Sequence, residues 1–399
     1  MAPAKSAKPT FIFGLSAKTG GKIAGRAGGR GGRRAVRRVG ILTGGGDCPG
    51  LNAVIRAVTK TLIYDHGAEV YGFLDGYAGL VESRYCRLEA HDVSNILTQG
   101  GTILGSSNKA NPFAYYPPEQ QDEAHAQPRD LSAACTAVCR QLGLEALVAI
   151  GGDGTMSIAD RLRRERGLSI VGVPKTIDND LPLTDLTFGF MTAVETATQA
   201  IDRLHSTGAS HHRAMIAEVM GRYAGWIALY AGVASGADVI LIPEIPYHID
   251  KVVAFIKRRG AVGKKSSIIC VAEGAKPRGG QMTVARVIKD SPDPIRLGGI
   301  GHKLARDIED RSGIECRATV LGYIQRGGTP CSRDRTLATK FGHHAAELVM
   351  AGKFGRLVVY RNGRIRDVAL GRAAGRIRKV PRNCDLIRSA RAVGTCFGD

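Results

Sequence analysis

The stretch VAIGGDGTMS, Val148 to Ser157, joins an apolar, β-branched run to a helix-like segment through a turn of three glycines, an aspartate and a threonine. The apolar run extends back to residue 146, as in a parallel strand that is buried on both faces. Strand, turn and helix in succession form the unit of α/β folds, whose ligands bind at the carboxyl ends of the strands. The stretch therefore predicts an α/β fold with a ligand site at this turn.

The rest of the chain repeats this order. Strands are predicted at residues 39–43, 146–150, 169–174, 214–220, 238–243 and 267–274. A first helix is predicted from apolar residues at helical spacing, namely Leu51, Val54, Ile55, Val58 and Leu62. A second apolar face runs through residues 190–205. Strands alternating with helices indicate parallel sheets, and a length of 399 residues indicates two or more lobes.

Composition narrows the class of protein. The chain is 44% hydrophobic, yet no apolar run approaches the roughly 18 residues of a membrane span, and the start lacks the pattern of a secretory signal. We therefore expect a globular, cytoplasmic protein that needs no membrane. The nine cysteines form no C-x-x-C pair, so reduced thiols are expected.

The basic charge is concentrated at the start of the chain. Residues 1–38 hold ten Lys or Arg and no acid, which is half of the net charge of +20. A Gly/Arg-rich tail over 1–37 is predicted to be disordered. A solvated extension, a contact with RNA or membranes, and a transit peptide all stay open for it, although a nucleic-acid partner is not favoured. Deletion of 1–37 would abolish any salt-sensitive binding to nucleic acid and leave an enzymatic activity intact.

Two glycine turns are candidate phosphate sites. Gly44, Gly45 and Gly46 follow the strand at 39–43 and precede a helix, where free N–H groups favour an anion. Neither the P-loop nor the dinucleotide pattern is present. In GGDGT, Asp153 would repel a phosphate unless a cation stood between them, so it is a candidate ligand of Mg²⁺, with a helix N-cap as the alternative. Gly154 leaves room for a polyphosphate.

The heptapeptide PKTIDND, Pro174 to Asp180, follows the strand at 169–174. In an extended segment Asp178 and Asp180 point the same way, because residues two apart share a face. Beside Lys175 and Thr176 they can form a pocket for a general base and a metal, whereas solvated loop acids are the alternative. Anion-binding candidates elsewhere are Arg213, Arg222, Arg317 and Arg326, with Glu273 as a candidate for sugar hydroxyls.

The order of the motifs resembles the 6-phosphofructokinase family. The motifs are GILTGGGDCPGLNAVIRAV, IGGDGT, PKTIDND, EVMGRYAG and ATVLGYIQRGG, and the resemblance runs from about Val39 to about the C-terminus. It implies two Rossmann-like lobes with parallel sheets and helices on both faces. The expected division is 38–188 plus about 325–375 for a nucleotide-binding lobe, and 189–324 plus about 376–399 for a lobe that binds fructose 6-phosphate.

The resemblance also implies roles. Asp178 would take the proton from the 1-hydroxyl of fructose 6-phosphate, with Thr176 and Asp180 in the same pocket. The phosphoryl donor would be held by Gly46, Gly152, Asp153, Gly154 and Thr155, with Asp153 serving Mg²⁺. The sugar phosphate would be held by Met220, Gly221, Arg222, Glu273 and Arg326. In the family, residues matching Arg213 and Arg317 reach that site from a neighbouring subunit, which implies a homo-oligomer, dimer or tetramer, with shared active sites.

Several positions depart from the bacterial ATP-dependent pattern. Asn108 and Lys109 stand where that pattern has an arginine, so Lys109 or Lys175 is expected to stabilise the donor phosphates. Tyr323 replaces a histidine of the sugar site. Basic residues match the family's effector site only in part, which predicts altered regulation, and these are Arg56, Lys60, Lys264 and Lys265.

The donor depends on two positions. Pyrophosphate-dependent members carry Asp at the position of Gly154 and Lys at the position of Lys175, whereas ATP-dependent bacterial members commonly carry Gly at both. This chain is mixed. An acid at 154 would repel and crowd the α-phosphate of ATP, so Gly154 favours ATP, and Lys175 would add positive charge at the transferred phosphoryl group. Use of pyrophosphate is the alternative, and a regulatory protein that binds sugar phosphate without catalysis is another.

Overall fold

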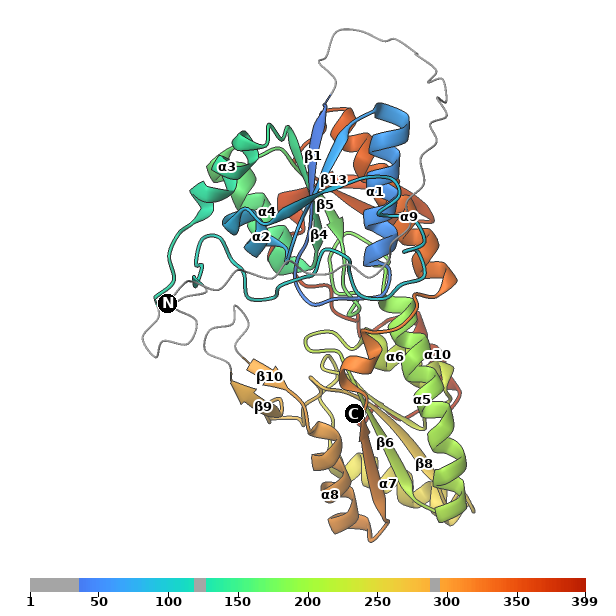
Figure 1. The fold of residues 1–399 in the computed structure, drawn as a ribbon. Coiled ribbons are helices and arrows are strands. Elements are labelled where there is room, and N and C mark those ends of the chain that lie inside the picture. Colours follow the sequence, from blue (N-terminus) through green and yellow to red (C-terminus); the bar gives the residue numbers. More distant parts are fainter. Residues whose placement is uncertain (1–35, 118–126, 288–294) are drawn as a thin grey trace, which may run out of the picture. The chain divides into compact units, whose positions relative to one another are not determined.

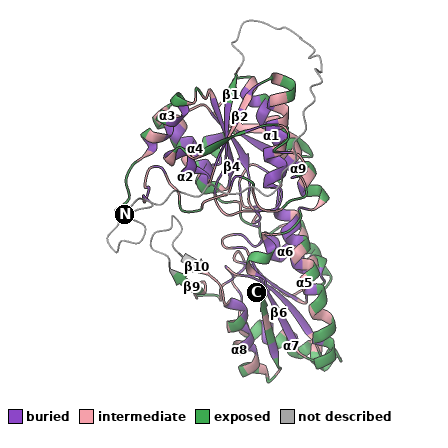
Figure 2. Ribbon diagram, in the orientation of Figure 1, coloured by how far each residue is buried: buried purple, intermediate pink, exposed green. Residues whose placement is uncertain are grey.

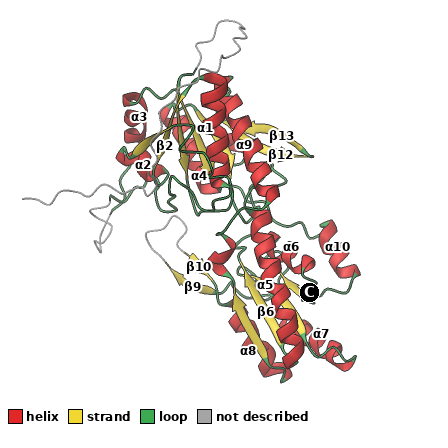
Figure 3. Ribbon diagram, turned by 45° about the vertical axis from the view of Figure 1, so that its right-hand side comes forward, coloured by secondary structure: helices red, strands yellow, loops and turns green. Residues whose placement is uncertain are grey.

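The computed structural model of the chain describes residues 36–117, 127–287 and 295–399. All but the last two residues of the predicted tail lie outside these ranges. Two main sheets organise the described residues, one of seven strands and one of four. Figure 3 shows helices packed along both of them. None of the helices in the described ranges combines the length and the apolar character that a membrane crossing requires.

The seven-stranded sheet has the order β13-β12-β5-β4-β1-β2-β3. Its strands are β1 (Arg38–Thr43), β2 (Glu69–Phe73), β3 (Tyr85–Leu88), β4 (Ala146–Gly151), β5 (Ile170–Pro174), β12 (Arg356–Arg361) and β13 (Arg364–Ala369). The five inner strands are parallel. The two outermost pairs, β2 with β3 and β12 with β13, are antiparallel. The parallel core is as predicted, but the sheet as a whole is mixed.

Helices cover both faces of this sheet, because alternate residues of its strands point to opposite sides. Val39 and Ile41 of β1 pack into a core shared with α1 (Leu51–His66) and α9 (Ser332–Met350). Leu42 joins a second core. The helices of that side are α2 (Tyr77–Glu82), α3 (Ser132–Gln141) and α4 (Asp153–Arg166). Figure 2 shows the strands buried between these helices.

The four-stranded sheet is parallel throughout, in the order β11-β6-β8-β7. Its strands are β6 (Ala214–Val219), β7 (Val239–Leu241), β8 (Ser267–Ala272) and β11 (Cys316–Val320). One face packs on α5 (Phe190–His211) and α6 (Trp226–Ala234), the other on α7 (Ile249–Ala261) and α8 (Ile300–Ser312). Figure 1 shows this arrangement. Parallel sheets with helices on both faces confirm the predicted fold class.

The remaining elements are short. They are the hairpin β9 (Val284–Val287) and β10 (Ile295–Leu297), the 3₁₀ turns η2 (Gly322–Gln325) and η3 (Leu370–Arg372), and α10 (Asp385–Ala392). The predicted strands are too long by one to two residues at the carboxyl ends of β6, β7 and β8, because each of these strands gives way to a turn. The helix predicted over 190–205 continues to residue 211.

Candidate active site

The glycine turn after β1 is held by backbone hydrogen bonds to two other segments. Gly44 N donates to Ile150 O at 2.9 Å, and Gly45 N donates to Ser107 O at 2.9 Å. The first bond ties the turn to the end of β4, and the second ties it to the loop that carries Lys109. Lys109 is exposed on that loop. The turn, the end of β4 and the Lys109 loop therefore meet at the carboxyl edge of the sheet.

The GGDGT motif is mostly helix. Gly152 is the N-cap of α4, and Asp153 is the first residue of the helix, so the alternative of Asp153 as the cap is wrong. Asp153 and Gly154 are exposed, and a methyl group built at Gly154 would meet no atom within 4 Å. A glycine within a helix lowers stability by about 0.5–1 kcal/mol relative to alanine. Nothing in the packing around Gly154 explains why the chain has glycine there. The open space at Gly154 is available to a ligand.

The Thr155 side chain, in contrast, serves the protein itself. It is buried, and its Oγ1 would lie 2.7 Å from a Cβ built on Gly44 and 2.3 Å from one built on Gly151. Those two glycines therefore make room for Thr155 between the ends of β1 and β4. Tyr77 Oη donates to Thr155 O at 2.9 Å and braces the same turn. Tyr77 could not be found from the sequence, because a hydrogen bond to a backbone oxygen requires no particular motif.

Two cations converge on Gly46. Lys175 is buried and its Nζ donates to Gly46 O. Arg326 Nη1 donates to Asp47 O at 3.2 Å and would lie 2.8 Å from a Cβ at Gly46. Burial lowers the pKa of Lys175, and the nearby Arg326 charge lowers it further. Gly46 is thus the point where a backbone turn and two positive side chains meet.

Asp178 and Asp180 are half-buried acids beside this cluster. Burial raises the pKa of Asp178, while the Arg326 and Lys175 charges oppose the rise. Burial, together with repulsion from Asp178 and Asp153, raises the pKa of Asp180 to about 7. Among the described residues, no hydrogen-bond donor reaches the buried Oδ1 of Asp178. Asp178 therefore has an acceptor oxygen that the protein does not use, next to two cations.

The second group of predicted residues lies at the carboxyl edge of the four-stranded sheet. Met220, Gly221 and Arg222 follow β6, and Glu273 follows β8. Gly221 has φ 139° and a Cβ there would sit 2.9 Å from Ala224 O, so the turn requires glycine. Burial raises the pKa of Glu273 to about 7, and the Asp178 charge adds to the rise, as does the Glu218 charge. Glu273 N donates to Val219 O at 2.9 Å, which holds Glu273 beside the Met220 turn.

Two predicted residues do not join this cluster within the chain. Arg213 and Arg317 stand at the amino ends of β6 and β11, one strand length or about 20 Å from Met220. Both pair with Glu315, Arg213 Nε lying 2.6 Å from its Oε2. The placement of the two arginines is compatible with their expected role toward another subunit. Tyr323 lies on η2 after the carboxyl end of β11, where its O accepts Arg326 N at 2.9 Å, and it is 76% exposed.

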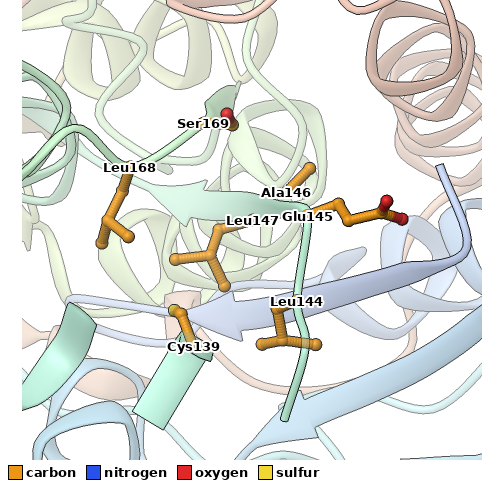
Figure 4. Close-up of a pocket in the computed structure, with 7 residues that line it drawn as sticks. All are labelled: Cys139, Leu144, Glu145, Ala146, Leu147, Leu168 and Ser169. Carbon is orange, nitrogen blue, oxygen red and sulfur yellow. The ribbon is translucent and has the colours of Figure 1, made fainter. Parts of the chain in front are cut away.

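A small cavity elsewhere is not part of this site. Figure 4 shows it at the amino end of β4, whereas the glycine turn lies at the carboxyl end of that strand. Its lining residues are Cys139, Leu144, Glu145, Ala146, Leu147, Leu168 and Ser169. The lining is largely aliphatic and includes none of the predicted site residues.

The residues present fit a magnesium ion that is coordinated mainly by the phosphates of a bound substrate and by water. Within the described ranges, no three His, Cys, Asp or Glu side chains are placed to hold a metal. Mg²⁺ usually binds proteins through one or two carboxylates and completes its shell with water and substrate phosphates. Exposed Asp153, next to the open space at Gly154, offers one such carboxylate.

An α/β fold whose glycine turns and cations meet at the carboxyl edge of its parallel strands is typical of proteins that bind phosphorylated ligands. The chain belongs to the phosphofructokinase family, because the family model described as Phosphofructokinase matches residues 38–349.

The relatives that are similar to this chain include proteins named for ATP and proteins named for pyrophosphate as the phosphoryl donor. It is 50% identical to ATP-dependent 6-phosphofructokinase 2 of Clostridium perfringens, over 91% of this chain and 99% of that protein. It is 49% identical to the pyrophosphate–fructose 6-phosphate 1-phosphotransferase of Amycolatopsis methanolica, over 86% of this chain and 96% of that protein. Overall identity therefore does not separate the two donors.

Solved structures agree on the fold. Phosphofructokinase of Pichia pastoris, in the T-state, matches with a TM-score of 0.71 and 32% identity, over 86% of this chain. This chain spans 36% of the length of that larger protein.

Proposed function

We propose that this protein is an ATP-dependent 6-phosphofructokinase. It transfers the γ-phosphoryl group of ATP to the 1-hydroxyl of D-fructose 6-phosphate and yields fructose 1,6-bisphosphate and ADP, a step of glycolysis in the cytoplasm. Family membership and the names of the similar proteins support the reaction class. The observation that carries the choice of ATP is the open space at Gly154, in the first turn of α4.

In this proposal Asp178 is the general base. Its unused Oδ1 accepts the proton of the 1-hydroxyl, and its raised pKa makes it a better base than an ordinary aspartate. Lys175 supplies positive charge where the phosphoryl group moves, since phosphoryl transfer depends mainly on positioning and on charge neutralisation. Thr176 and Asp180 line the same pocket. Thr176 Oγ1 accepts the Asp178 backbone N–H at 3.1 Å and so supports the orientation of the base.

The donor site is assigned to Gly46, Gly152, Asp153, Gly154, Thr155 and Lys109. The backbone N–H groups at the start of α4 suit phosphate oxygens, and Gly154 leaves room for the α-phosphate and the nucleoside beyond it. Mg²⁺, when bound with the donor, neutralises phosphate charge. Asp153 is the residue that would hold it.

The acceptor site is assigned to Met220, Gly221, Arg222, Glu273 and Arg326. Glu273, next to the Met220 turn, suits sugar hydroxyls, and the arginines suit the 6-phosphate. Tyr323 stands in the place of a histidine of this acceptor site. Arg213 and Arg317 would complete the acceptor site of a neighbouring subunit in a homo-oligomer. The division into a nucleotide-binding lobe and a sugar-phosphate lobe follows the two sheets in this proposal.

The test of the base is Asp178→Asn, which keeps the size of the side chain and removes its basicity. We expect turnover, followed as fructose 1,6-bisphosphate, to fall by about 10²–10⁴-fold, the usual worth of a general base. Calorimetric titration with fructose 6-phosphate is expected to show binding within a few-fold of wild type. A loss of only a few-fold in turnover would remove Asp178 as the base.

A pyrophosphate-dependent enzyme is the second candidate, and Lys175 is the observation that favours it. The Lys175 ammonium stands over the Gly46 turn, where it can serve a pyrophosphate as readily as ATP. Gly154 weighs against this candidate. An acid at position 154 would exclude the α-phosphate of a nucleotide, and this chain has no acid there.

A further inference from the structure

The turn that carries Asp178 and Asp180 has an unusual backbone conformation between these two acids. Asn179 has φ 51°, in the left-handed region that residues with a side chain seldom adopt. Asparagine tolerates this region better than most residues with a side chain, and here its surroundings also hold it in place. The buried Asn179 side chain contributes, because its Oδ1 accepts Thr187 N at 3.0 Å and its Nδ2 donates to Asp185 O at 3.3 Å.

The remaining support comes from a distant part of the chain, the segment 373–384 between η3 and α10, here termed the C-terminal strap. Arg378 of this strap donates to Asn179 O from Nε at 3.2 Å and from Nη2 at 2.8 Å. Its Nη2 also donates to Asp185 O at 3.2 Å, and its backbone N donates to Asp180 O at 2.6 Å. One residue thus binds two carbonyls of the acidic turn and a third at Asp185, the residue that the Asn179 side chain also contacts.

The other side of Arg378 holds Trp226, the first residue of α6. The guanidinium carbon lies 4.4 Å from the centre of the indole ring, and Trp226 Nε1 donates to Arg378 O at 3.0 Å. α6 follows the turn that contains Met220, Gly221 and Arg222, which is assigned above to the sugar phosphate. Arg378 therefore lies between the turn of the proposed base and the helix that follows the proposed phosphate turn.

The chemistry of these contacts requires arginine. A planar guanidinium can donate to two carbonyls in its plane while it stacks an aromatic ring on its face. A lysine ammonium cannot make both sets of contacts at once. The hydrogen bond from Trp226 Nε1 goes to the backbone O of residue 378 and would be kept in any variant, so the stacking and the bonds to Asn179 O and Asp185 O are what the arginine side chain adds.

We infer that Arg378 is a positioning residue that fixes the Asp178–Asp180 turn relative to α6, and so sets the base against the sugar phosphate. The inference rests on the proposed function for its kinetic consequence. Its structural consequence, that Trp226 is stacked under Arg378, is independent of any reaction. The chain contains a single tryptophan, so Trp226 alone reports on this contact by fluorescence.

The test compares Arg378→Gln and Arg378→Lys with Arg382→Gln. Arg382 is a matched control, because it lies on the same strap and donates to a backbone carbonyl, Glu244 O at 3.0 Å, away from the acidic turn. In both Arg378 variants we expect kcat to fall by about 10–100-fold, as for a misplaced catalytic group, with the KM for ATP within about two-fold of wild type. Arg382→Gln is expected to retain kcat within about two-fold.

Acrylamide quenching and the emission maximum of Trp226 form the second readout. Both are expected to change in the two Arg378 variants and to stay as in wild type in Arg382→Gln, at temperatures where all are folded by circular dichroism. Full kcat in Arg378→Lys, or equal losses in Arg378→Gln and Arg382→Gln, would overturn the inference. If the wild-type protein turned over with neither ATP nor pyrophosphate, the proposed function would fail. In that case, unchanged quenching in Arg378→Gln would still refute the contact between Arg378 and Trp226.

Discussion

Gly154 is the residue on which the choice of donor depends. It lies in the first turn of α4 and is exposed, and a Cβ placed on its backbone would have no neighbour within 4 Å. The protein therefore has space for a larger residue there, and only a ligand would be affected by it. Steric and electrostatic effects of a substitution can be separated, because Ala adds bulk and Asp adds both bulk and charge.

We predict that Gly154→Asp reduces kcat/KM for ATP at least about tenfold more than it reduces any kcat/KM for pyrophosphate, because the carboxylate repels and crowds the α-phosphate. Gly154→Ala is the control. It is expected to keep ATP use closer to wild type and to raise the free energy of unfolding by about 0.5–1 kcal/mol, since Ala favours the helix. Equal losses with both donors in Gly154→Asp would contradict this role of Gly154.

The acids of the site set its dependence on pH. Asp178 and Asp180 repel one another, and burial raises the pKa of both, to about 7 for Asp180. A base works only when ionised, so activity is expected to fall as the pH drops through the raised pKa values. The two acids take up protons as a pair, and the acidic limb of the profile belongs to both.

Asp180→Asn removes the member of the pair whose pKa is raised to about 7, so that only Asp178 is left to titrate. We predict that the acidic limb of the kcat/KM profile for fructose 6-phosphate moves to lower pH, whatever happens to the maximal rate. Glu165→Gln, on the exposed side of α4, serves as the control and should leave the profile unmoved. A limb that stayed in place, or moved to higher pH, would show that repulsion between the acids does not set it.

For individual residues, the sequence predicts which residues belong to the site better than it predicts how their side chains are arranged. The spacing predicts Asp178 and Asp180 on one face of an extended segment, but the segment is a turn in which Asn179 has φ 51°. That the two acids share one pocket stays a prediction. Thr155 is predicted to hold the donor, but its side chain fills the gap between Gly44 and Gly151, so only its backbone N–H is left for that role, which stays a prediction. A one-dimensional pattern does not show which side of a helical turn a side chain takes.

Among the elements, α5 and α9 are joined at their first turns by a buried acid. Asp334 Oδ2 accepts Thr192 N at 2.8 Å and Thr192 Oγ1 at 2.6 Å. Burial raises the pKa of Asp334, and the hydrogen bonds from Thr192 oppose that rise. Loss of the acceptor would leave the Thr192 N–H without a partner in the interior.

We predict that Asp334→Ala lowers the free energy of unfolding by about 1–3 kcal/mol, the penalty of a buried donor without an acceptor. Asp334→Asn keeps an acceptor oxygen and should lower it by less. Urea unfolding followed by circular dichroism measures both values. Equal midpoints for Asp334→Ala and wild type would mean that water or another group replaces the carboxylate.

The parallel inner strands can be predicted because each is a continuous apolar run. The antiparallel edges cannot, since β3 and β13 carry exposed residues and lack such runs. Asn362 and Gly363, both at positive φ, form the two-residue turn between β12 and β13, and this Asn-Gly pair is the available signal for a hairpin. The contacts of Arg378 leave no signal in the sequence, because they join residues nearly 200 positions apart.

For the whole molecule, active sites shared between subunits stay a prediction from the family resemblance, with which the position of Arg213 and Arg317 at the far end of the four-stranded sheet agrees. Asp178→Asn and Arg213→Gln should each be inactive alone. Co-expressed in a dimer that mixes at random, they should restore about a quarter of the wild-type activity, because half of the sites in each hybrid carry neither change. No recovery, with hybrids demonstrated by mass spectrometry, would place both residues in one subunit's site.

The most direct measurement is the initial rate of fructose 1,6-bisphosphate formation by the full chain from fructose 6-phosphate and Mg²⁺, with ATP and pyrophosphate supplied in parallel. We predict turnover with ATP and at most a small fraction of that rate with pyrophosphate. A faster rate with pyrophosphate would contradict the proposed function and show that Lys175, rather than Gly154, decides the donor. No turnover with either donor would favour a protein that binds the sugar phosphate without catalysis.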